Sequence, residues 1–326
     1  MQAIFRQPIP QDPKHEKGLA FAPTNIALVK YWGKRDVELN LPVTSSLSIA
    51  LLDKGAMTTI TLQDQAYDTV VLNNQAIPAH SEFAKRISQF LDLFRPEKKW
   101  HVHIDIKMNI PAAAGLASSA CGFASLMSAL NDLFNWQLTL RQLSILARLG
   151  SGSAARSFWT GFVEWHAGVQ PDGMDSVAEP LAIEWPMLRV GLLTMSEKQK
   201  PISSREAMQR TVDSSILYSA WPKKVMQDLA ILKQALHTKN FSLLGGTAES
   251  NALTMHATML ASWPAVCYFL PETIAAMHQI WALRQQGMEL YFTQDAGPNL
   301  KLLFLETDTH HVKANFPTVE IVKVFE

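Results

Sequence analysis

A loop of small residues in the sequence could bind the phosphates of a nucleotide. It runs from Pro111 to Ala120 and contains Ser118 and Ser119. Small side chains let a ligand approach the backbone closely, and backbone N–H groups at the start of a helix bind anions, so the loop suits a triphosphate. Tight helix packing is the alternative explanation for such a loop. No G-x-x-x-x-G-K-[ST] motif occurs in the sequence, which excludes a P-loop site.

Two further segments combine cations with hydroxyl or aromatic groups. Lys30, Lys34 and Arg35 surround a Tyr-Trp pair, and such a combination can bind phosphate and shield it from water, although an ordinary strand and turn can look the same. The second segment, Gly150 to Ser157, contains Arg156 behind two serines. Its guanidinium could grip a carboxylate through two hydrogen bonds, and the serines suit phosphate oxygens.

A single carboxylate follows an aromatic, strand-like run near the end of the chain. Asp295 lies between Tyr291 and Asn299, directly before an Ala-Gly-Pro turn. It could act as a catalytic base, or it could only form the turn. This segment alone does not decide between the two.

The elements that must position these residues are strands first and mostly helices later, which predicts an α+β fold. Residues 220–238 and 272–286 show helical periodicity, and Gly287 ends the second of these helices. The polar stretch 196–204 is interpreted as a domain junction or a mobile substrate loop. Further helices are expected over 115–130 and 139–149, and strands over 58–62, 69–72, 101–106, 162–165 and 188–193, with a turn at 73–74.

The composition is that of a compact protein with no preference for nucleic acid. Of the 326 residues, 48% are hydrophobic and 18% charged, and 29 cations balance 29 carboxylates, so any anion must be bound locally. Two cysteines allow one disulfide, but Cys121 is expected in the core; a reducing cytoplasm is predicted. The uncharged stretch 108–131 is too rich in small residues for a membrane span. His101 and His103 share a strand face, where plain surface is favoured over metal binding.

Taken together and in this order, four segments resemble the diphosphomevalonate decarboxylase family of the GHMP kinase superfamily. They read N-I-A-L-V-K-Y-W-G-K-R-D, P-A-A-A-G-L-A-S-S-A, G-S-G-S-A-A-R-S and F-T-Q-D-A-G-P-N, and the resemblance spans about residues 24–302. It implies a GHMP kinase fold with an N-terminal ribosomal-protein-S5-domain-2-like domain over 1–190. A C-terminal ferredoxin-like GHMP domain, over 191–326, would carry the catalytic aspartate, with the active site in the cleft between the domains.

The resemblance also implies the reaction and its residues. ATP would phosphorylate the 3-hydroxyl of (R)-5-diphosphomevalonate, and loss of phosphate and CO2 would give isopentenyl diphosphate and ADP. Mg²⁺ is expected with few direct protein ligands, and a homodimer without nucleic-acid or membrane partners is expected. The implied catalytic residues are Asp295, Lys30 and Arg156; the substrate residues are Tyr31, Lys34, Ser151, Arg156, Ser204 and Arg205; the ATP residues are Gly115, Leu116, Ala117, Ser118, Ser119 and Ser153.

Three other functions stay open, and three stretches depart from the family pattern. A mevalonate 3-kinase, a phosphomevalonate decarboxylase and a non-catalytic ligand sensor on the same fold are the alternatives, although the full catalytic set argues against them. The stretch 106–111 differs from the family's sequence before the phosphate loop. Thr44 and Ser45 replace the family's Asn pair, and the extension through Gly18 has no assigned role.

Overall fold

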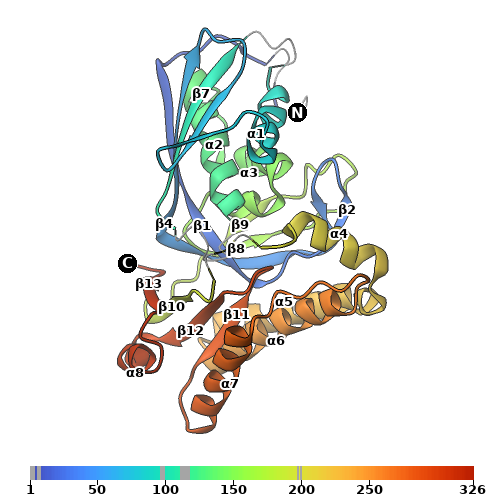
Figure 1. Cartoon of the computed structure of the whole chain (residues 1–326), viewed down its shortest axis with the longest axis vertical. Helices are drawn as coiled ribbons and strands as arrows, with labels where there is room; N and C mark the ends of the chain where they lie inside the picture. The colour runs from blue at the N-terminus through green and yellow to red at the C-terminus, as the bar shows by residue number, and fades with distance from the viewer. Residues whose placement is uncertain (1–3, 6–8, 96–99, 111–117, 197, 199) are drawn as a thin grey trace.

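The computed structural model describes residues 4–5, 9–95, 100–110, 118–196, 198 and 200–326. These residues form two α+β units, one above the other in Figure 1, which confirms the predicted fold class. The upper unit contains the first half of the chain, and the lower one contains the long helices and the C-terminus (Figure 1). No helix among the described residues is both long and apolar enough to cross a membrane.

The upper unit is built on a seven-stranded sheet within the described residues. Its strands are β1 (Lys17–Val29), β4 (Ser46–Gln63), β5 (Thr69–Leu72), β6 (Gln75–Ile77), β7 (His101–Met108), β8 (Gly161–Trp165) and β9 (Ala178–Pro180). The sheet order is β6-β5-β7-β4-β8-β9, and β1 is antiparallel to the long β4 over most of its length. Asn73 and Asn74, at φ 48° and 64°, make the predicted turn between β5 and β6.

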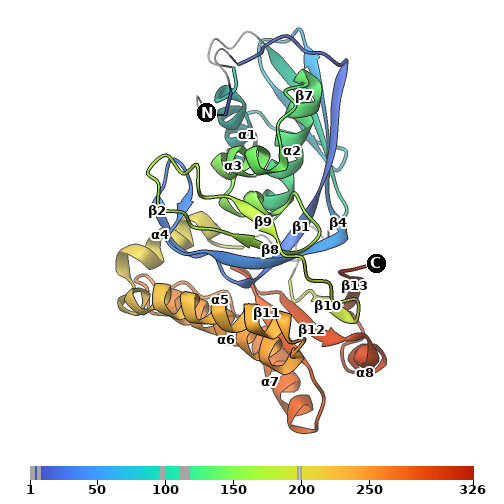
Figure 2. The same ribbon diagram turned by 180° about the vertical axis from the view of Figure 1, so that it is seen from behind.

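Three helices lie on one side of this sheet (Figure 1, Figure 2). They are α1 (Glu82–Asp92), α2 (Ser118–Phe134) and α3 (Leu140–Gly150). Thr139 and Gln142 form a capping box that starts α3 where it was predicted. Gly150 is the last residue of α3, and an added Cβ there would lie 2.1 Å from the Phe123 ring of α2. The sequence did not predict α1, and the predicted helix start at 115 lies outside the described residues.

The lower unit packs helices on a four-stranded antiparallel sheet of order β11-β12-β10-β13. Its strands are β10 (Leu188–Leu193), β11 (Tyr291–Gln294), β12 (Leu300–Leu305) and β13 (Glu320–Lys323). Its helices are α4 (Ser204–Ser214), α5 (Trp221–His237), α6 (Phe241–Leu260), α7 (Pro271–Gln285) and α8 (Thr309–Asn315). The expected helices at 220–238 and 272–286 are confirmed as α5 and α7. The predicted domain boundary at residue 190 falls inside β10, and the division into domains over 1–190 and 191–326 stays a prediction.

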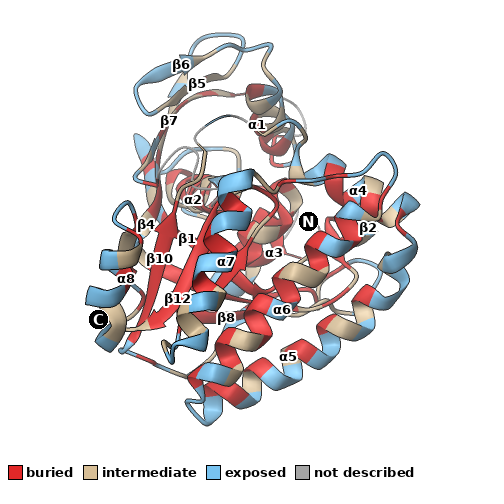
Figure 3. Cartoon of the chain, turned by 60° about the horizontal axis from the view of Figure 1, so that its bottom comes forward, coloured by how far each residue is buried: buried red, intermediate tan, exposed pale blue. Residues whose placement is uncertain are grey.

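Short elements complete the fold. They are β2 (Lys34–Asp36), β3 (Leu41–Pro42) and the 3₁₀ turns η1 (Gly152–Arg156), η2 (Ile216–Ala220) and η3 (Glu306–Asp308). Figure 3 shows buried residues along the strands of both units and exposed residues on the outer sides of α5 and α7. Both cysteines are free: Cys121 is buried in α2, as predicted, and Cys267 is exposed.

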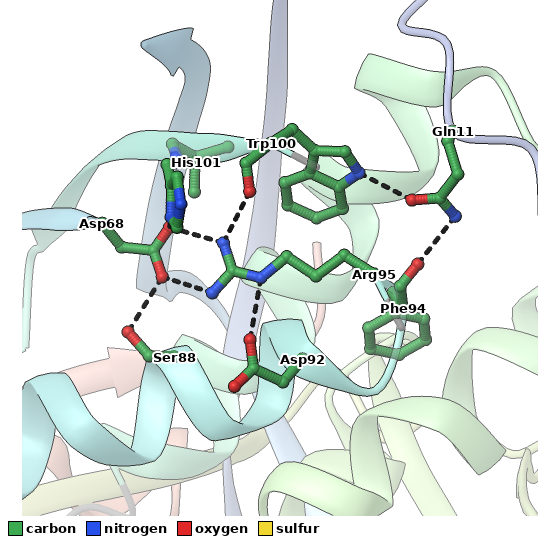
Figure 4. Close-up of polar contacts among 9 residues, drawn as sticks. Gln11, Asp68, Ser88, Asp92, Phe94, Arg95, Trp100 and His101 are labelled. Atoms are coloured by element: carbon green, nitrogen blue, oxygen red, sulfur yellow. Dashed lines mark hydrogen bonds and ion pairs between the residues drawn. The ribbon is translucent and has the colours of Figure 1, made fainter. Parts of the chain in front are cut away.

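A buried ion-pair cluster holds the end of α1 against the sheet (Figure 4). Arg95 donates to both carboxylate oxygens of Asp68, at 2.6 and 2.7 Å, and to the Trp100 carbonyl at 2.9 Å. The side chains of Arg95 and Asp68 are 3% and 2% exposed. Gln11, from the N-terminal extension that had no assigned role, accepts from the Trp100 indole at 2.7 Å and donates to the Phe94 carbonyl at 2.9 Å. The extension therefore helps to fix this corner of the upper unit.

We expect Asp68→Asn to destabilise the fold by about 3 kcal/mol, because it removes the buried carboxylate that binds both Nη atoms of Arg95 and, among the described residues, leaves only the ion pair of Nε with Asp92. Burial alone would raise the pKa of Asp68, but the hydrogen bonds and charge of Arg95 hold it below its usual value. The stabilisation by Asp68 is therefore present above the unfolded pKa, near 3.9, and disappears as the pH falls through the folded pKa. Urea unfolding at pH 7 and at successively lower pH should show that the difference in unfolding free energy between the unaltered protein and Asp68→Asn becomes smaller as the pH falls.

The exposed Asp64→Asn is the matched control for this prediction and should change stability by less than about 0.5 kcal/mol. Equal unfolding free energies for Asp68→Asn and Asp64→Asn at pH 7 would contradict the proposed importance of the cluster.

Candidate active site

A buried ion pair between Lys30 and Asp295 joins the upper unit to the lower unit. Lys30 directly follows β1, and its Nζ donates to Asp295 Oδ1 at 2.8 Å and to the Ala27 carbonyl at 2.7 Å. Asp295 follows β11, in a tight turn in which Gly297 N donates to the Asp295 carbonyl at 2.7 Å. The side chain of Lys30 is 2% exposed and that of Asp295 is 21% exposed. A carboxylate that is open to a ligand thus rests on a buried ammonium.

A second lysine faces the same carboxylate. Lys301, on β12, places Nζ 3.2 Å from Asp295 Oδ2, and its side chain is 1% exposed. Burial alone would raise the pKa of Asp295, but the charges and hydrogen bonds of Lys30 and Lys301 hold it well below its usual range. Burial lowers the pKa of Lys30 to about 8, although Asp295 opposes this shift. At neutral pH the carboxylate is therefore ionised and Lys30 is mostly protonated.

Arg156 is fixed beside this pair by residues of the upper unit. Its Nη1 donates to Ser46 Oγ at 2.6 Å, its Nε donates to Asn25 Oδ1 at 3.2 Å, and the guanidinium lies 5.7 Å from the Trp165 ring centroid. Burial lowers its pKa to about 10, and the charge of Asp295 opposes that shift. The guanidinium stays charged at neutral pH, and no described residue accepts from its Nη2. A bound carboxylate could take that position.

Three serine hydroxyls form a chain at the start of α2 and η1. Ser119 Oγ lies 3.2 Å from Ser151 Oγ, which lies 3.3 Å from Ser153 Oγ. This serine chain (Ser119, Ser151 and Ser153) joins residues that the resemblance assigned to two different ligands, ATP and the substrate. Ser118 is exposed at the first position of α2, whereas Gly115, Leu116 and Ala117 lie outside the described residues.

Next to the serine chain, three cations line one side of the site. Lys34 on β2, Arg86 on α1 and Arg205 on α4 each lie within range of another's charge. Burial, together with the charges of Arg205 and Arg86, lowers the pKa of Lys34 to about 8. A cavity of about 410 Å³ opens here, with Arg86, Gly150 and Arg205 in its lining. This cation trio (Lys34, Arg86 and Arg205) suits a ligand with more than one negative charge.

Tyr31 and Ser204, two other expected substrate residues, lie at the edges of this region. The Tyr31 ring packs edge-on against Trp165 with 4.8 Å between centroids, and its buried hydroxyl has no hydrogen-bond partner among the described residues. Ser204 Oγ accepts from Lys200 Nζ at 2.6 Å, and Lys200 also donates to the Ala296 carbonyl at 2.8 Å. Lys200 thus connects α4 to the turn of Asp295.

The sequence analysis missed several residues of this site. Lys200 lies in the polar stretch 196–204, which was interpreted as a domain junction or a mobile substrate loop without a role for Lys200 itself. Lys301 and Arg86 lie in a strand and a helix whose patterns give no sign of a ligand. The same holds for Asn251 and His256 on α6, since that helix was not predicted.

The structure also shows the surroundings of residues whose role the sequence left open. His103 Nδ1 lies 2.8 Å from Thr69 Oγ1, and His101 Nδ1 lies 3.6 Å from Asp68 Oδ1, so both side chains contact the upper sheet. Among the residues described, no three His, Cys, Asp or Glu side chains gather where they could hold a metal ion. Ser45 Oγ, at the departure from the family's Asn pair, accepts from Ala167 N at 2.9 Å.

Comparison with known proteins identifies similar sequences and structures over most of the chain. A diphosphomevalonate decarboxylase-like N-terminal domain family matches residues 22–178, and a mevalonate 5-diphosphate decarboxylase C-terminal domain family matches residues 190–322. The diphosphomevalonate decarboxylase of Aspergillus fumigatus is 36% identical over 321 residues, which cover 91% of this chain and 79% of that protein.

Solved structures agree with the sequence comparisons. A structure of MDDEF in complex with MVAPP, AMPPCP and magnesium superposes with a TM-score of 0.90 at 36% identity, over 95% of this chain and 97% of that one. The mevalonate diphosphate decarboxylase from Staphylococcus aureus superposes with a TM-score of 0.88 at 35% identity, over 95% and 96% of the two chains.

Proposed function

The chain belongs to the diphosphomevalonate decarboxylase family, and on that premise we propose that Asp295, Lys30 and Arg156 carry out its reaction. The enzyme uses ATP to convert (R)-5-diphosphomevalonate to isopentenyl diphosphate, CO2, ADP and phosphate. The 3-hydroxyl oxygen bonds to the γ-phosphorus while the bond from that phosphorus to the β–γ bridging oxygen breaks and its electron pair leaves with ADP. The phosphate then leaves C3 with the C–O electron pair. The electron pair of the C–C bond to the carboxylate forms the alkene as CO2 departs.

The buried Lys30–Asp295 ion pair is the observation that carries this assignment. With its pKa held low, Asp295 is a weak base, so its main contribution is to orient the 3-hydroxyl. The proton passes to Asp295 late, once the oxygen has begun to bond to phosphorus and the proton has become acidic. This sequence suits a loose phosphoryl-transfer transition state, in which positioning matters more than base strength.

Arg156 holds the substrate carboxylate through the Nη2 side of its guanidinium. Ser46 and Asn25 fix the other side, so the guanidinium plane is set before the substrate binds. Fixing the carboxylate aligns the C–C bond that must break with the departing phosphate. Developing positive charge at C3 is then quenched by loss of CO2, and the buried surroundings of Arg156 and Lys30 exclude the water that could trap it.

The serine chain is the proposed support for the ATP phosphates and Mg²⁺. Hydroxyl oxygens are hard donors of the kind that Mg²⁺ accepts, and Ser119 and Ser153 lie close enough to Ser151 to serve ligands on both sides. Bound Mg²⁺ supplies charge neutralisation between phosphate oxygens. Ser118, at the start of α2, adds a further hydroxyl on the nucleotide side, and the expected contacts of residues 115–117 stay a prediction.

The cation trio, together with Tyr31, Ser151 and Ser204, is the proposed site for the 5-diphosphate. Lys34 and Arg205 were expected there, and Arg86 joins them because it lies within range of both charges and lines the same cavity. Three cations match a diphosphate better than a monophosphate, which supports the diphosphate as the substrate.

We expect Asp295→Asn to lower kcat by about 10²- to 10⁴-fold, because the amide cannot take the proton and no longer attracts Lys30. The protein is incubated with ATP, Mg²⁺ and each of mevalonate, its 5-phosphate and its 5-diphosphate, and products are followed by mass spectrometry. The unaltered protein should form isopentenyl diphosphate from the 5-diphosphate only, and the exposed Asp64→Asn should match it.

The same experiment distinguishes the alternatives. A 3-phosphorylated product that accumulates without CO2 would identify a mevalonate 3-kinase, and turnover of the monophosphate alone would identify a phosphomevalonate decarboxylase. Ligand binding without any turnover would identify a sensor. Full activity in Asp295→Asn would remove Asp295 from the proposed mechanism.

Arg86→Met is expected to raise KM for the 5-diphosphate by about 10-fold or more, with a smaller effect on kcat. Hydrogen bonds to charged groups contribute about 1.5–3 kcal/mol, and this one is made equally in the ground and transition states. Steady-state kinetics measure the effect. Arg141→Met is the control, since Arg141 lies on α3 with its side chain 55% exposed and pairs with Glu179. An unchanged KM in Arg86→Met would place the diphosphate elsewhere.

We also infer that the protein works as a homodimer in the cytoplasm. Members of the family that the chain resembles are commonly homodimers, which supports the dimer. The exposed free thiol of Cys267 supports a reducing compartment. Sedimentation of the purified protein should give about twice the chain mass of 36.3 kDa, and a sedimenting monomer would contradict the dimer.

A further inference from the structure

Helix α6 contacts the backbone beside both members of the catalytic ion pair, although none of the proposed chemistry uses its side chains. It packs against α5 and against β1 and β11, the strands that lead to Lys30 and Asp295. Glu249, Asn251 and His256 are buried polar residues of this helix, with exposures of 6%, 0% and 2%. A buried polar group costs stability unless it is hydrogen-bonded, so the partners of these three residues indicate what they do.

Asn251 bonds to the backbone of Lys30. Its Oδ1 accepts from Lys30 N at 2.8 Å, and its Nδ2 donates to Asp228 Oδ2 at 2.8 Å. Asp228, on α5, is itself held by Lys224 Nζ at 2.5 Å, which fixes the rotamer of Asn251. The end of β1 is therefore attached to a rigid pair of helices, at the residue whose ammonium faces Asp295.

His256 bonds to the backbone of Asp295. Its Nε2 lies 3.1 Å from the Asp295 carbonyl, which can only accept, so this nitrogen carries the proton. Burial lowers the pKa of His256 to about 3, so the ring is neutral in the working pH range. The ring stacks on Phe269 with 4.8 Å between centroids, and this stacking fixes its orientation.

Glu249 attaches the same helix to the strand before Asp295. Its Oε2 accepts from Phe292 N at 3.3 Å, and Arg284 and Trp281 hold its two oxygens. Glu249 and His256 are seven residues apart, which places them on the same side of the helix, two turns from each other. The position of β11 and of the turn behind it is therefore set along α6.

We propose that Asn251 and His256 are positioning residues, through which α6 fixes the backbones of Lys30 and Asp295 at the separation that the reaction requires. The inference rests on the proposed function of that pair. Lys30 and Asp295 come from different units, and their mutual side-chain contact alone leaves the turn of Asp295 free to shift. A shift of about 1 Å at a reacting group can lower the rate roughly 10²-fold.

The test compares two substitutions of His256. His256→Phe keeps the ring and its stacking but removes the N–H, whereas His256→Gln keeps a donor near the position of Nε2. We expect His256→Phe to lower kcat roughly 10- to 100-fold while KM for both substrates changes less than about threefold, and His256→Gln to recover most of the rate. Asn251→Leu, which removes the acceptor for Lys30 N, should also lower kcat more than it raises KM.

The pH dependence of kcat distinguishes a loss of positioning from a loss of stability, because a less stable but correctly positioned site would keep the same pH dependence. Asp295 raises the pKa of Lys30, whereas Lys301 and Arg156 lower it. If the carboxylate moves away from Lys30, that pKa falls, so the basic limb of kcat, near pH 8 in the unaltered protein, should shift to lower pH in His256→Phe. Lys200, Lys301, Arg156 and His256 itself are the other titratable groups near Asp295, and His256 stays neutral over the pH range of that limb because burial lowers its pKa to about 3.

Thr258→Val is the matched control on the same helix. Thr258 is buried, and among the described residues its hydroxyl bonds only to the Met255 carbonyl within α6, at 2.7 Å. Loss of the hydroxyl should therefore lower thermal stability without changing kcat or the pH profile. The proposal fails if His256→Phe keeps the kcat and basic limb of the unaltered protein, if Thr258→Val loses as much rate, or if His256→Gln is as slow as His256→Phe. Absence of turnover in the unaltered protein would instead overturn the proposed function.

Discussion

The contact between Lys30 and Asp295 is the constraint on which the active site depends. Its ammonium comes from the end of a strand in the upper unit, and its carboxylate from a turn in the lower unit. A buried charge without a partner is strongly unfavourable, so the two units are most stable in the docked arrangement that pairs these groups. The same arrangement brings Arg156 and the serine chain of the upper unit to Asp295. Assembly of the fold and assembly of the site are thus one event.

Buried polar groups give this arrangement its geometry. An apolar interface of the same area would tolerate sliding, because dispersion and hydrophobic forces have little directionality. Asn251, Trp221 and Thr293 of the lower unit each bond to the backbone of the upper unit at a fixed distance, so a displaced unit would leave several of them unsatisfied. The cost of burying these groups is offset only in the correct register. The Arg95–Asp68 cluster does the same for α1, which carries Arg86.

Sequence reasoning was most successful where local chemistry decides the structure. Thr139 and Gln142 make a capping box that is visible in the sequence, and β7 alternates buried and half-buried residues as its pattern predicted. Helix α6 was missed because it is buried on several sides and its polar residues point inward, so it shows no single apolar stripe. Lys301 and Arg86 were missed for a related reason. Their importance comes from Asp295, 6 residues from Lys301, and from Arg205, 119 residues from Arg86, and only the fold brings these charges together.

The concentration of cations around the site changes the meaning of the chain's neutrality. Among the described residues, eight cations (Lys30, Lys34, Arg86, Arg148, Arg156, Lys200, Arg205 and Lys301) lie there with three carboxylates (Asp295, Glu38 and Asp172). The site therefore carries an excess of positive charge although the net charge of the whole chain is zero. Polyanions are attracted to this face, and the attraction weakens as ionic strength rises.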